Sequence, residues 1–294
     1  CFPAATPCPP SALTICSPAH STWKRWLYLN EKMKKTKIKG IPFELPEEIA
    51  HFISGADVYD SSCSPEARVY FIDKENGYFL KCAKAGALEK EAAMTKFFHS
   101  KNLGAEVLTY LSYPDTDLLL TAAVKGEDCT REEYLSRPER LCDVLACELR
   151  KLHETDFFAC PVPDRTADYL TFAEENYRTG NYDKTSFPDS FGYRNAEEAY
   201  AVLTEGKSAL QSKVLLHGDY CLPNVILDNW KLSGFIDVGS GGVGDRHIDL
   251  FWGTWTLFFN LKTDKYRSRL LDAYGRDKAD ESLLKIIAAA EVFG

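Results

Sequence analysis

The sequence predicts an α+β fold of two lobes, a small N-terminal lobe rich in β-strands and a larger, mainly helical C-terminal lobe. From about residue 41 to residue 120, runs of β-branched and aromatic residues alternate with turn signals. After Val124 the apolar residues recur mostly at helical spacing. We therefore place the first lobe at residues 33–123 and the second at residues 124–294.

Four strands and one helix are expected in the first lobe. The runs ARVYFI and GYFLKCA, at residues 67–72 and 77–83, flank DKENG, a hairpin turn signal. Residues 87–101 combine helix formers with an apolar stripe at helical spacing. EVLTYLSYP and DLLLTAA, at residues 106–114 and 117–123, predict two more strands. The lobe is therefore expected to be a small sheet with one helix packed on it.

The second lobe is expected to consist of helices around one pair of strands. Residues 131–156 form a long amphipathic pattern that Pro138 breaks, and residues 165–181 and 195–210 also have a helical pattern. Between residues 224 and 238, NVILD and LSGFIDV are separated by only a few residues. This connection is too short for a crossover between parallel strands, so the two runs predict an antiparallel hairpin.

Composition and charge exclude several classes of protein. With 45% apolar residues and no apolar run of 18 or more, the chain is expected to be globular, without a membrane partner. The net charge of −8 argues against a nucleic-acid partner, because such proteins usually carry a basic face, and a cationic small molecule suits this charge better. The ten cysteines contain no C-x-x-C pair, so we expect reduced thiols in a cytoplasmic protein and no structural metal.

The first 32 residues differ from the rest of the chain. They are rich in Pro, Ser, Thr and Ala, and their basic residues Lys24, Arg25 and Lys32 come late, the reverse of a secretory signal. We expect the folded protein to begin near Met33, with residues 1–32 disordered or not native to it.

A G-x-G-x-x-G pattern, Gly239, Gly241 and Gly244, follows a short apolar run. Such a pattern occurs in Rossmann dinucleotide sites, which also carry an acidic residue about twenty residues later, here Asp264. A Rossmann loop, however, lies inside a βαβ unit. The strand before these glycines belongs instead to the predicted antiparallel hairpin, so the dinucleotide interpretation fails.

Three polar residues bracket that hairpin. Asp219 and Asn224 stand on the loop before it, and Asp237 ends its second strand. Turn residues of this kind often only hydrogen-bond the backbone. Together, though, they have the layout of a kinase catalytic centre, where a loop Asp handles the acceptor hydroxyl and an Asn and a second Asp hold Mg²⁺ through oxygen ligands. The combination favours phosphoryl transfer.

A kinase site also requires a lysine from the small lobe. Lys81 ends the run GYFLK, where its ammonium would meet the α- and β-phosphates of a nucleotide. Glu91 follows ten residues later on the predicted helix, where it can pair with the lysine. Either residue alone would be an ordinary surface charge, but in this order they complete the kinase set.

With these residues in view, the chain resembles the aminoglycoside O-phosphotransferases, which have a protein-kinase-like fold, and within them the 3'-phosphotransferases. The resemblance runs from about Val58 to Phe293, and HGDYCLPN and FIDVGSGGVGDRHIDL are its most specific segments. Gly239 matches a turn glycine of the family, as does Gly242, whereas Gly241 falls at a position where the family varies.

The resemblance implies a role for each of these residues. Asp219 is the catalytic residue that orients the acceptor hydroxyl and takes its proton. Asn224 and Asp237 hold Mg²⁺. Lys81 binds the α- and β-phosphates of ATP, with GTP as an alternative donor, and Glu91 holds Lys81 in place.

Further nucleotide contacts are implied in the same way. LLLTAAVKGE is similar to the hinge between the lobes, where Thr121 and Ala123 would meet adenine through the backbone. Phe79 matches the aromatic residue that stacks on the base. SPEARVY is similar to the loop that covers the phosphates, which places Ser64 nearest the γ-phosphate.

The acceptor side of the resemblance implies substrate carboxylates at Asp183, Asp189 and Glu291. Here the chain departs from the family pattern: Ser240 stands where the 3' group usually has Arg, and Ala290 replaces the first of two terminal acids. The implied substrate is a cationic aminoglycoside, whose phosphorylation gives resistance. The protein is expected to be a monomer or a weak dimer. Two alternatives remain: a kinase of another small hydroxylated amine or antibiotic, and a non-catalytic nucleotide-binding module.

Overall fold

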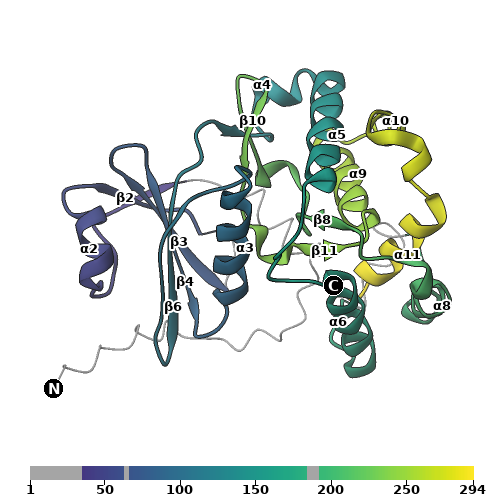
Figure 1. Cartoon of the computed structure of the whole chain (residues 1–294), viewed down its shortest axis with the longest axis horizontal. Helices are drawn as coiled ribbons and strands as arrows, with labels where there is room; N and C mark the ends of the chain where they lie inside the picture. The colour runs from purple at the N-terminus through teal and green to yellow at the C-terminus, as the bar shows by residue number, and fades with distance from the viewer. Residues whose placement is uncertain (1–34, 63–65, 184–191) are drawn as a thin grey trace.

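The computed structural model describes residues 35–62, 66–183 and 192–294. The predicted leader, residues 1–32, lies outside this part of the chain. The described residues form a six-stranded sheet at one end of the molecule and a helical lobe at the other (Figure 1). The two-lobed α+β architecture predicted from the sequence is therefore confirmed.

The N-terminal sheet is antiparallel throughout, with the strand order β1-β2-β3-β4-β6-β5. All four strands predicted from the sequence are present, and two short strands are added at one edge. The bounds are β1 Thr36–Ile38, β2 Asp57–Asp60, β3 Ala67–Asp73, β4 Tyr78–Lys84, β5 Val107–Ser112 and β6 Thr116–Ala122.

Strand β4 separates the apolar core of this lobe from the side that faces the helical lobe. Successive side chains of a strand point to opposite faces. Leu80 and Cys82 are buried in the core of the small lobe. Phe79 and Lys81 point to the other face, where the Lys81 ammonium reaches Asp237 of the helical lobe.

The expectation of a single helix in this lobe is wrong, because a second helix, α2, spans Glu47–Ile53. It packs Ile49, which is fully buried, against the face of the sheet that carries Leu80. Seven residues make only two turns, too few to show helical periodicity in the sequence.

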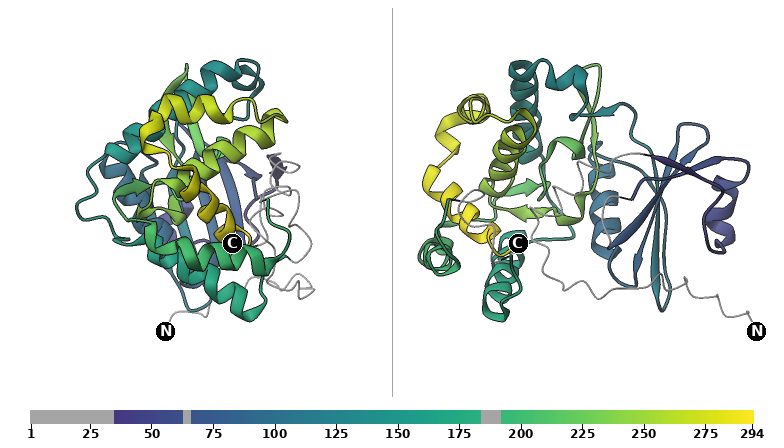
Figure 2. Two further views of the ribbon diagram at one scale, coloured as in Figure 1. Left: turned by 90° about the vertical axis from the view of Figure 1, so that its right-hand side faces the viewer. Right: turned by 180° about the vertical axis from the view of Figure 1, so that it is seen from behind.

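Helix α3, Glu89–Ser100, is the predicted helix, and it lies between the sheet and the helical lobe (Figures 1 and 2). Asp117 of β6 accepts a hydrogen bond from the backbone N–H of Leu88 at its start, 2.9 Å away, and so caps a helix whose own N-cap side chain offers no acceptor. Met94 and Phe98 are fully buried in the large core of the helical lobe. Helix α3 of the N-terminal lobe thus also packs into the core of the helical lobe.

The helical lobe surrounds one large core, and its predicted helices are present. Helix α5 begins at Pro138, which lacks an N–H and is well tolerated in a first helical turn. No helix in the three described ranges is long and apolar enough to span a membrane. The bounds are α4 Glu132–Leu135, α5 Pro138–Glu154, α6 Arg165–Thr179, α8 Ala196–Gly206, α9 His247–Leu261, α10 Arg267–Gly275 and α11 Glu281–Glu291.

The predicted hairpin is confirmed. Strands β9, Val225–Asp228, and β10, Lys231–Phe235, pair antiparallel. Their turn residues Asn229 and Trp230 have φ values of 53° and 66°, as a tight hairpin turn requires. Since these two strands form a hairpin, no βαβ unit precedes the glycines.

Three short strands complete the scaffold of the helical lobe. Strand β7, Glu127–Asp128, pairs with β9, and β8, Val214–Leu216, pairs with β11, Gly242–Gly244. Gly241 stands just before β11, and a Cβ there would lie 2.8 Å from the carbonyl oxygen of Leu216. This position therefore needs glycine for a local steric reason, without any dinucleotide.

Candidate active site

The catalytic loop runs from β8 to β9 and carries the predicted residues Asp219 and Asn224. The Asn224 side-chain amide donates to Asp219 Oδ2 and to the Asp219 carbonyl oxygen, each at 3.0 Å. The other carboxylate oxygen, Oδ1, is buried and has no hydrogen-bond partner among the described residues. A buried carboxylate oxygen without a partner is costly, so it marks a place where a donor belongs.

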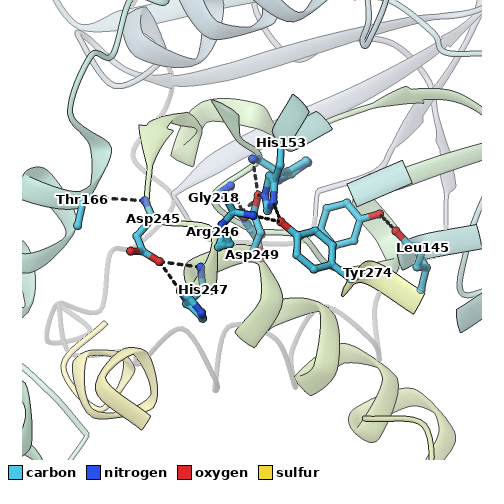
Figure 3. A network of polar contacts seen from close by, with 12 residues as sticks. Leu145, His153, Thr166, Gly218, Asp245, Arg246, His247, Asp249 and Tyr274 are labelled. Carbon is cyan, nitrogen blue, oxygen red and sulfur yellow. Dashed lines mark hydrogen bonds and ion pairs between the residues drawn. The ribbon is translucent and has the colours of Figure 1, made fainter. Parts of the chain in front are cut away.

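Asp249 of α9 braces this loop from below (Figure 3). Its two carboxylate oxygens accept the backbone N–H groups of His217 and Gly218, both at 2.8 Å. The carboxylate is fully buried, and His153 Nε2 lies 3.2 Å from Oδ2. Three donors therefore satisfy one carboxylate and fix the backbone just before Asp219.

A chain of polar contacts continues from Asp249 through His153 and Tyr274 to Arg246. Burial lowers the pKa of His153 although Asp249 acts in the opposite direction, which favours a neutral ring. A neutral ring that donates to Asp249 through Nε2 accepts through Nδ1, and the Tyr274 hydroxyl lies 2.8 Å from Nδ1. Arg246 donates in turn to that hydroxyl at 3.2 Å (Figure 3).

The turn at Gly218 allows the loop to lie against the segment that follows β10. Gly218 has φ +82°, and a Cβ there would lie 1.9 Å from the carbonyl oxygen of Ser240. Only glycine fits such a contact. The same carbonyl accepts a hydrogen bond from Arg165 Nε at 2.7 Å, so a guanidinium from α6 reaches the backbone of Ser240.

Asp237 lies beside Asn224 at the end of the hairpin. The Ile236 N–H donates to the Asn224 carbonyl oxygen at 3.1 Å, and Asp237 itself has φ 55°, an uncommon value for a residue other than glycine. In the described ranges, no three His, Cys, Asp or Glu side chains come together as a metal cluster. One Asp and one Asn fit Mg²⁺ of the kinase type, which takes its other ligands from phosphate and water.

Lys81 joins the two lobes at this point. Its ammonium lies 2.8 Å from both carboxylate oxygens of Glu91 and 3.2 Å from Asp237 Oδ1. Burial acts to lower the pKa of Lys81, but the charges of Asp237 and Glu91 outweigh it and raise the pKa above the ordinary lysine value. The predicted pairing with Glu91 is present, and the lysine is held as a cation.

The predicted base-binding residues lie together where the sheet meets the hinge. Phe79 pairs with Thr121 across β4 and β6, and Ala123 follows that strand. The N–H of Ala123 already donates to the Gly77 carbonyl oxygen at 2.9 Å, so it can serve a base only if that bond opens. Ser64, expected near the γ-phosphate, lies outside the described residues.

Of the three predicted acceptor carboxylates, the structure describes Asp183 and Glu291. Asp189 lies outside the described residues, and Asp183 is largely buried. Glu291 is 3% exposed, and its Oε1 accepts hydrogen bonds from the Tyr169 hydroxyl at 2.7 Å and Trp252 Nε1 at 3.0 Å.

The pKa of Glu291 is shifted by burial and by the charge of Asp219. Burial raises its pKa to about 7, against the hydrogen bonds from Tyr169 and Trp252, and the charge of Asp219 raises the pKa further. Sequence reasoning missed both hydrogen-bond donors, because they come from helices far away in the chain. In this conformation Glu291 is hydrogen-bonded inside the helical lobe.

Comparison with known proteins places the chain in a family. Residues 65–284 match the model of APH, described as the phosphotransferase enzyme family. The chain belongs to this family. A "Probable aminoglycoside 3'-phosphotransferase" of Lactococcus lactis subsp. lactis (strain IL1403) is 50% identical over 251 residues, 85% of this chain and 95% of the relative. An aminoglycoside 3'-phosphotransferase of Niallia circulans is 28% identical over 84% of the chain and 97% of the relative. The resemblance to aminoglycoside O-phosphotransferases is thereby confirmed.

Solved structures of phosphotransferases share the fold. An aminoglycoside-3'-phosphotransferase of type VIII superposes with a TM-score of 0.69 at 23% identity, covering 85% of this chain and all of that one. APH(3'')-Id of Streptomyces rimosus, in complex with ADP and streptomycin, gives a TM-score of 0.63 at 22% identity over 77% of this chain and 91% of that one. At these identities the likeness shows the kinase-like fold alone.

Proposed function

We propose that the protein transfers the γ-phosphoryl group of ATP to a hydroxyl of an aminoglycoside antibiotic and so confers resistance. The observation that carries the proposal is the unpaired, buried Oδ1 of Asp219, next to Asn224. The hydroxyl of an acceptor supplies the donor that this oxygen lacks. Names of relatives at up to 50% identity support the same substrate class.

Each residue of the site has a defined task in that reaction. Asp219 orients the acceptor hydroxyl through Oδ1 and takes its proton as the phosphoryl group arrives. Lys81, fixed between Glu91 and Asp237, binds the α- and β-phosphates. Because phosphoryl transfer passes through a loose transition state, positioning and charge neutralisation account for most of the catalysis.

Two residues of the site would hold Mg²⁺. Because the Asn224 amide nitrogen donates to Asp219, its carbonyl oxygen is left as a ligand, and the Asp237 carboxylate provides another. When bound, Mg²⁺ would neutralise the charge of the transferring phosphates. Phe79 would stack on the base, with Thr121 and Ala123 at the hinge beside it and Ser64 near the γ-phosphate.

A kinase of another small hydroxylated amine or antibiotic is the second candidate. Glu291 supports it, because this carboxylate already accepts two internal hydrogen bonds and its pKa of about 7 leaves it partly protonated near neutral pH. Fewer free carboxylates at the acceptor side favour an acceptor with fewer ammonium groups.

Release of ADP from Mg²⁺-ATP in the presence of kanamycin, neomycin, amikacin or streptomycin tests the proposal. We expect turnover with at least one of the four, loss of at least about 10³-fold in kcat in Asp219→Asn, and little change in the exposed Asp264→Asn control. ADP binding to the inactive variant shows that it is folded. Nucleotide binding without turnover on any of the four would refute the aminoglycoside assignment and favour the second candidate.

A further inference from the structure

The nucleotide side of the small lobe contains a lysine that neither motif nor family resemblance assigns. The Lys35 ammonium lies over the ring of Phe71, 3.5 Å from its centroid, and 5.6 Å from the centroid of Phe79. The two rings are themselves in contact, with centroids 5.1 Å apart. Lys35 therefore covers the aromatic pair that contains the predicted base-stacking residue.

Strand register explains why these residues meet. Phe79 pairs with Phe71, Phe71 with Tyr59, and Tyr59 with Lys37, so one row of side chains crosses four strands. Lys35 stands two residues before Lys37 in the chain and shares its face of the sheet. This is the face that carries Lys81, the face toward the helical lobe.

Charged residues of the helical lobe act on the Lys35 ammonium. Burial lowers its pKa, Glu127 acts to raise the pKa, and Arg131 acts to lower it. Glu127 and Arg131 both come from the segment that follows the hinge. The ammonium thus lies over Phe71 and near Phe79, on the face of the sheet that is directed toward the helical lobe.

We propose that Lys35 competes with the purine ring for the aromatic face of Phe79 and Phe71 and so weakens nucleotide binding. A flat base stacked on Phe79 and an ammonium above the same pair of rings occupy the same space. The base must therefore displace the lysine before it binds. This proposal rests on the proposed function, because it takes Phe79 as the base-stacking residue.

The competition is measurable as a change in nucleotide affinity. Because an exposed cation–π contact is weak, Lys35→Ala should lower the Kd for both adenosine and ADP about two- to fivefold. Lys37→Ala is the matched control: it removes the same charge two residues away, from a lysine whose ammonium pairs with Asp57 at 2.6 Å. Isothermal titration calorimetry of each variant with adenosine and with ADP, at equal ionic strength, distinguishes an effect on binding of the base from an effect on binding of the phosphates.

The titrations decide whether Lys35 competes with the base. Tighter binding of both ligands in Lys35→Ala, with Lys37→Ala unchanged, supports competition with the base. Weaker ADP binding with unchanged adenosine binding makes Lys35 a phosphate ligand and overturns the proposal, as does no change for either ligand. A wild-type protein that binds neither ligand overturns the proposed function itself, which is a different result. Thermal unfolding of both variants confirms that they are folded.

Discussion

Replacing Glu291 by glutamine should change how the stability of the protein depends on pH. In the wild type, burial raises the pKa of this carboxyl from 4.5 to about 7. Between these two pH values the folded protein keeps a proton that the unfolded chain has released. Stability contributed by this proton is fully present below about pH 4.5, falls as the pH rises toward 7, and stays lost above it.

The size of the effect follows from that difference in pKa. A change from 4.5 to about 7 corresponds to about 3 kcal/mol of unfolding free energy. The amide introduced by Glu291→Gln would keep an acceptor for Tyr169 and Trp252 but does not titrate. The unfolding free energy of the variant therefore does not fall with pH in the way expected for the wild type. For a chain of this length the difference amounts to about 6 °C in Tm between acidic and basic conditions.

Thermal unfolding of both proteins from about pH 5 to about pH 8.5, a range that spans the titration of this carboxyl, measures the effect. The quantity of interest is the Tm of Glu291→Gln minus that of the wild type, and we expect it to increase steadily up to about pH 7.5 and then level off. A constant offset from the new amide does not affect that slope. Glu205→Gln, at an exposed position on α8, controls for the loss of a carboxylate. A difference in Tm that is independent of pH would show that burial does not raise the pKa of the Glu291 carboxyl.

Two further substitutions test the parts of the site that hold Asp219 and Lys81. In Glu91→Gln, Lys81 loses one of its two anionic partners, so the KM for ATP should rise about tenfold. The control Glu89→Gln changes an exposed residue of the same helix and should leave the KM for ATP unchanged. Equal KM values for the two variants would contradict the role of Glu91. Asp249→Asn leaves one of its buried donors without an acceptor, so the protein should lose about 2–4 kcal/mol of unfolding free energy and most of its kcat, with KM for ATP little changed. Chemical denaturation measures the unfolding free energy of Asp249→Asn, and steady-state kinetics measure its kcat and KM. An unchanged kcat would refute the role of Asp249 in holding the backbone before Asp219.

The spatial grouping of the predicted catalytic residues could be anticipated because they lie on neighbouring elements of the chain. Asp219, Asn224 and Asp237 all lie within twenty residues on one loop and one hairpin, so their spacing alone brings them together. Lys81 and Glu91 stand ten residues apart on a strand and the helix after it. Strand alternation and helix periodicity were enough to predict those elements.

The surroundings of the centre were not predictable from local patterns. The Tyr169 hydroxyl bonds Glu291 across 122 residues of chain, and His153 meets Asp249 across 96. No spacing rule covers such contacts, which depend on how whole helices pack. For the same reason the sequence could not show that Glu291 is bonded inside the lobe, or that Lys35 lies over Phe71.

The position of α3 has a consequence for the pairing of Glu91 with Lys81. To move Glu91 away from Lys81, the helix would have to withdraw Met94 and Phe98, both fully buried, from the core of the other lobe. Exposing two such side chains costs about 3–6 kcal/mol, which limits a displaced helix to between about one molecule in 160 and about one in 25,000. A helix held in this way keeps Glu91 beside Lys81 in almost every folded molecule, so this ion pair forms as the two lobes fold together.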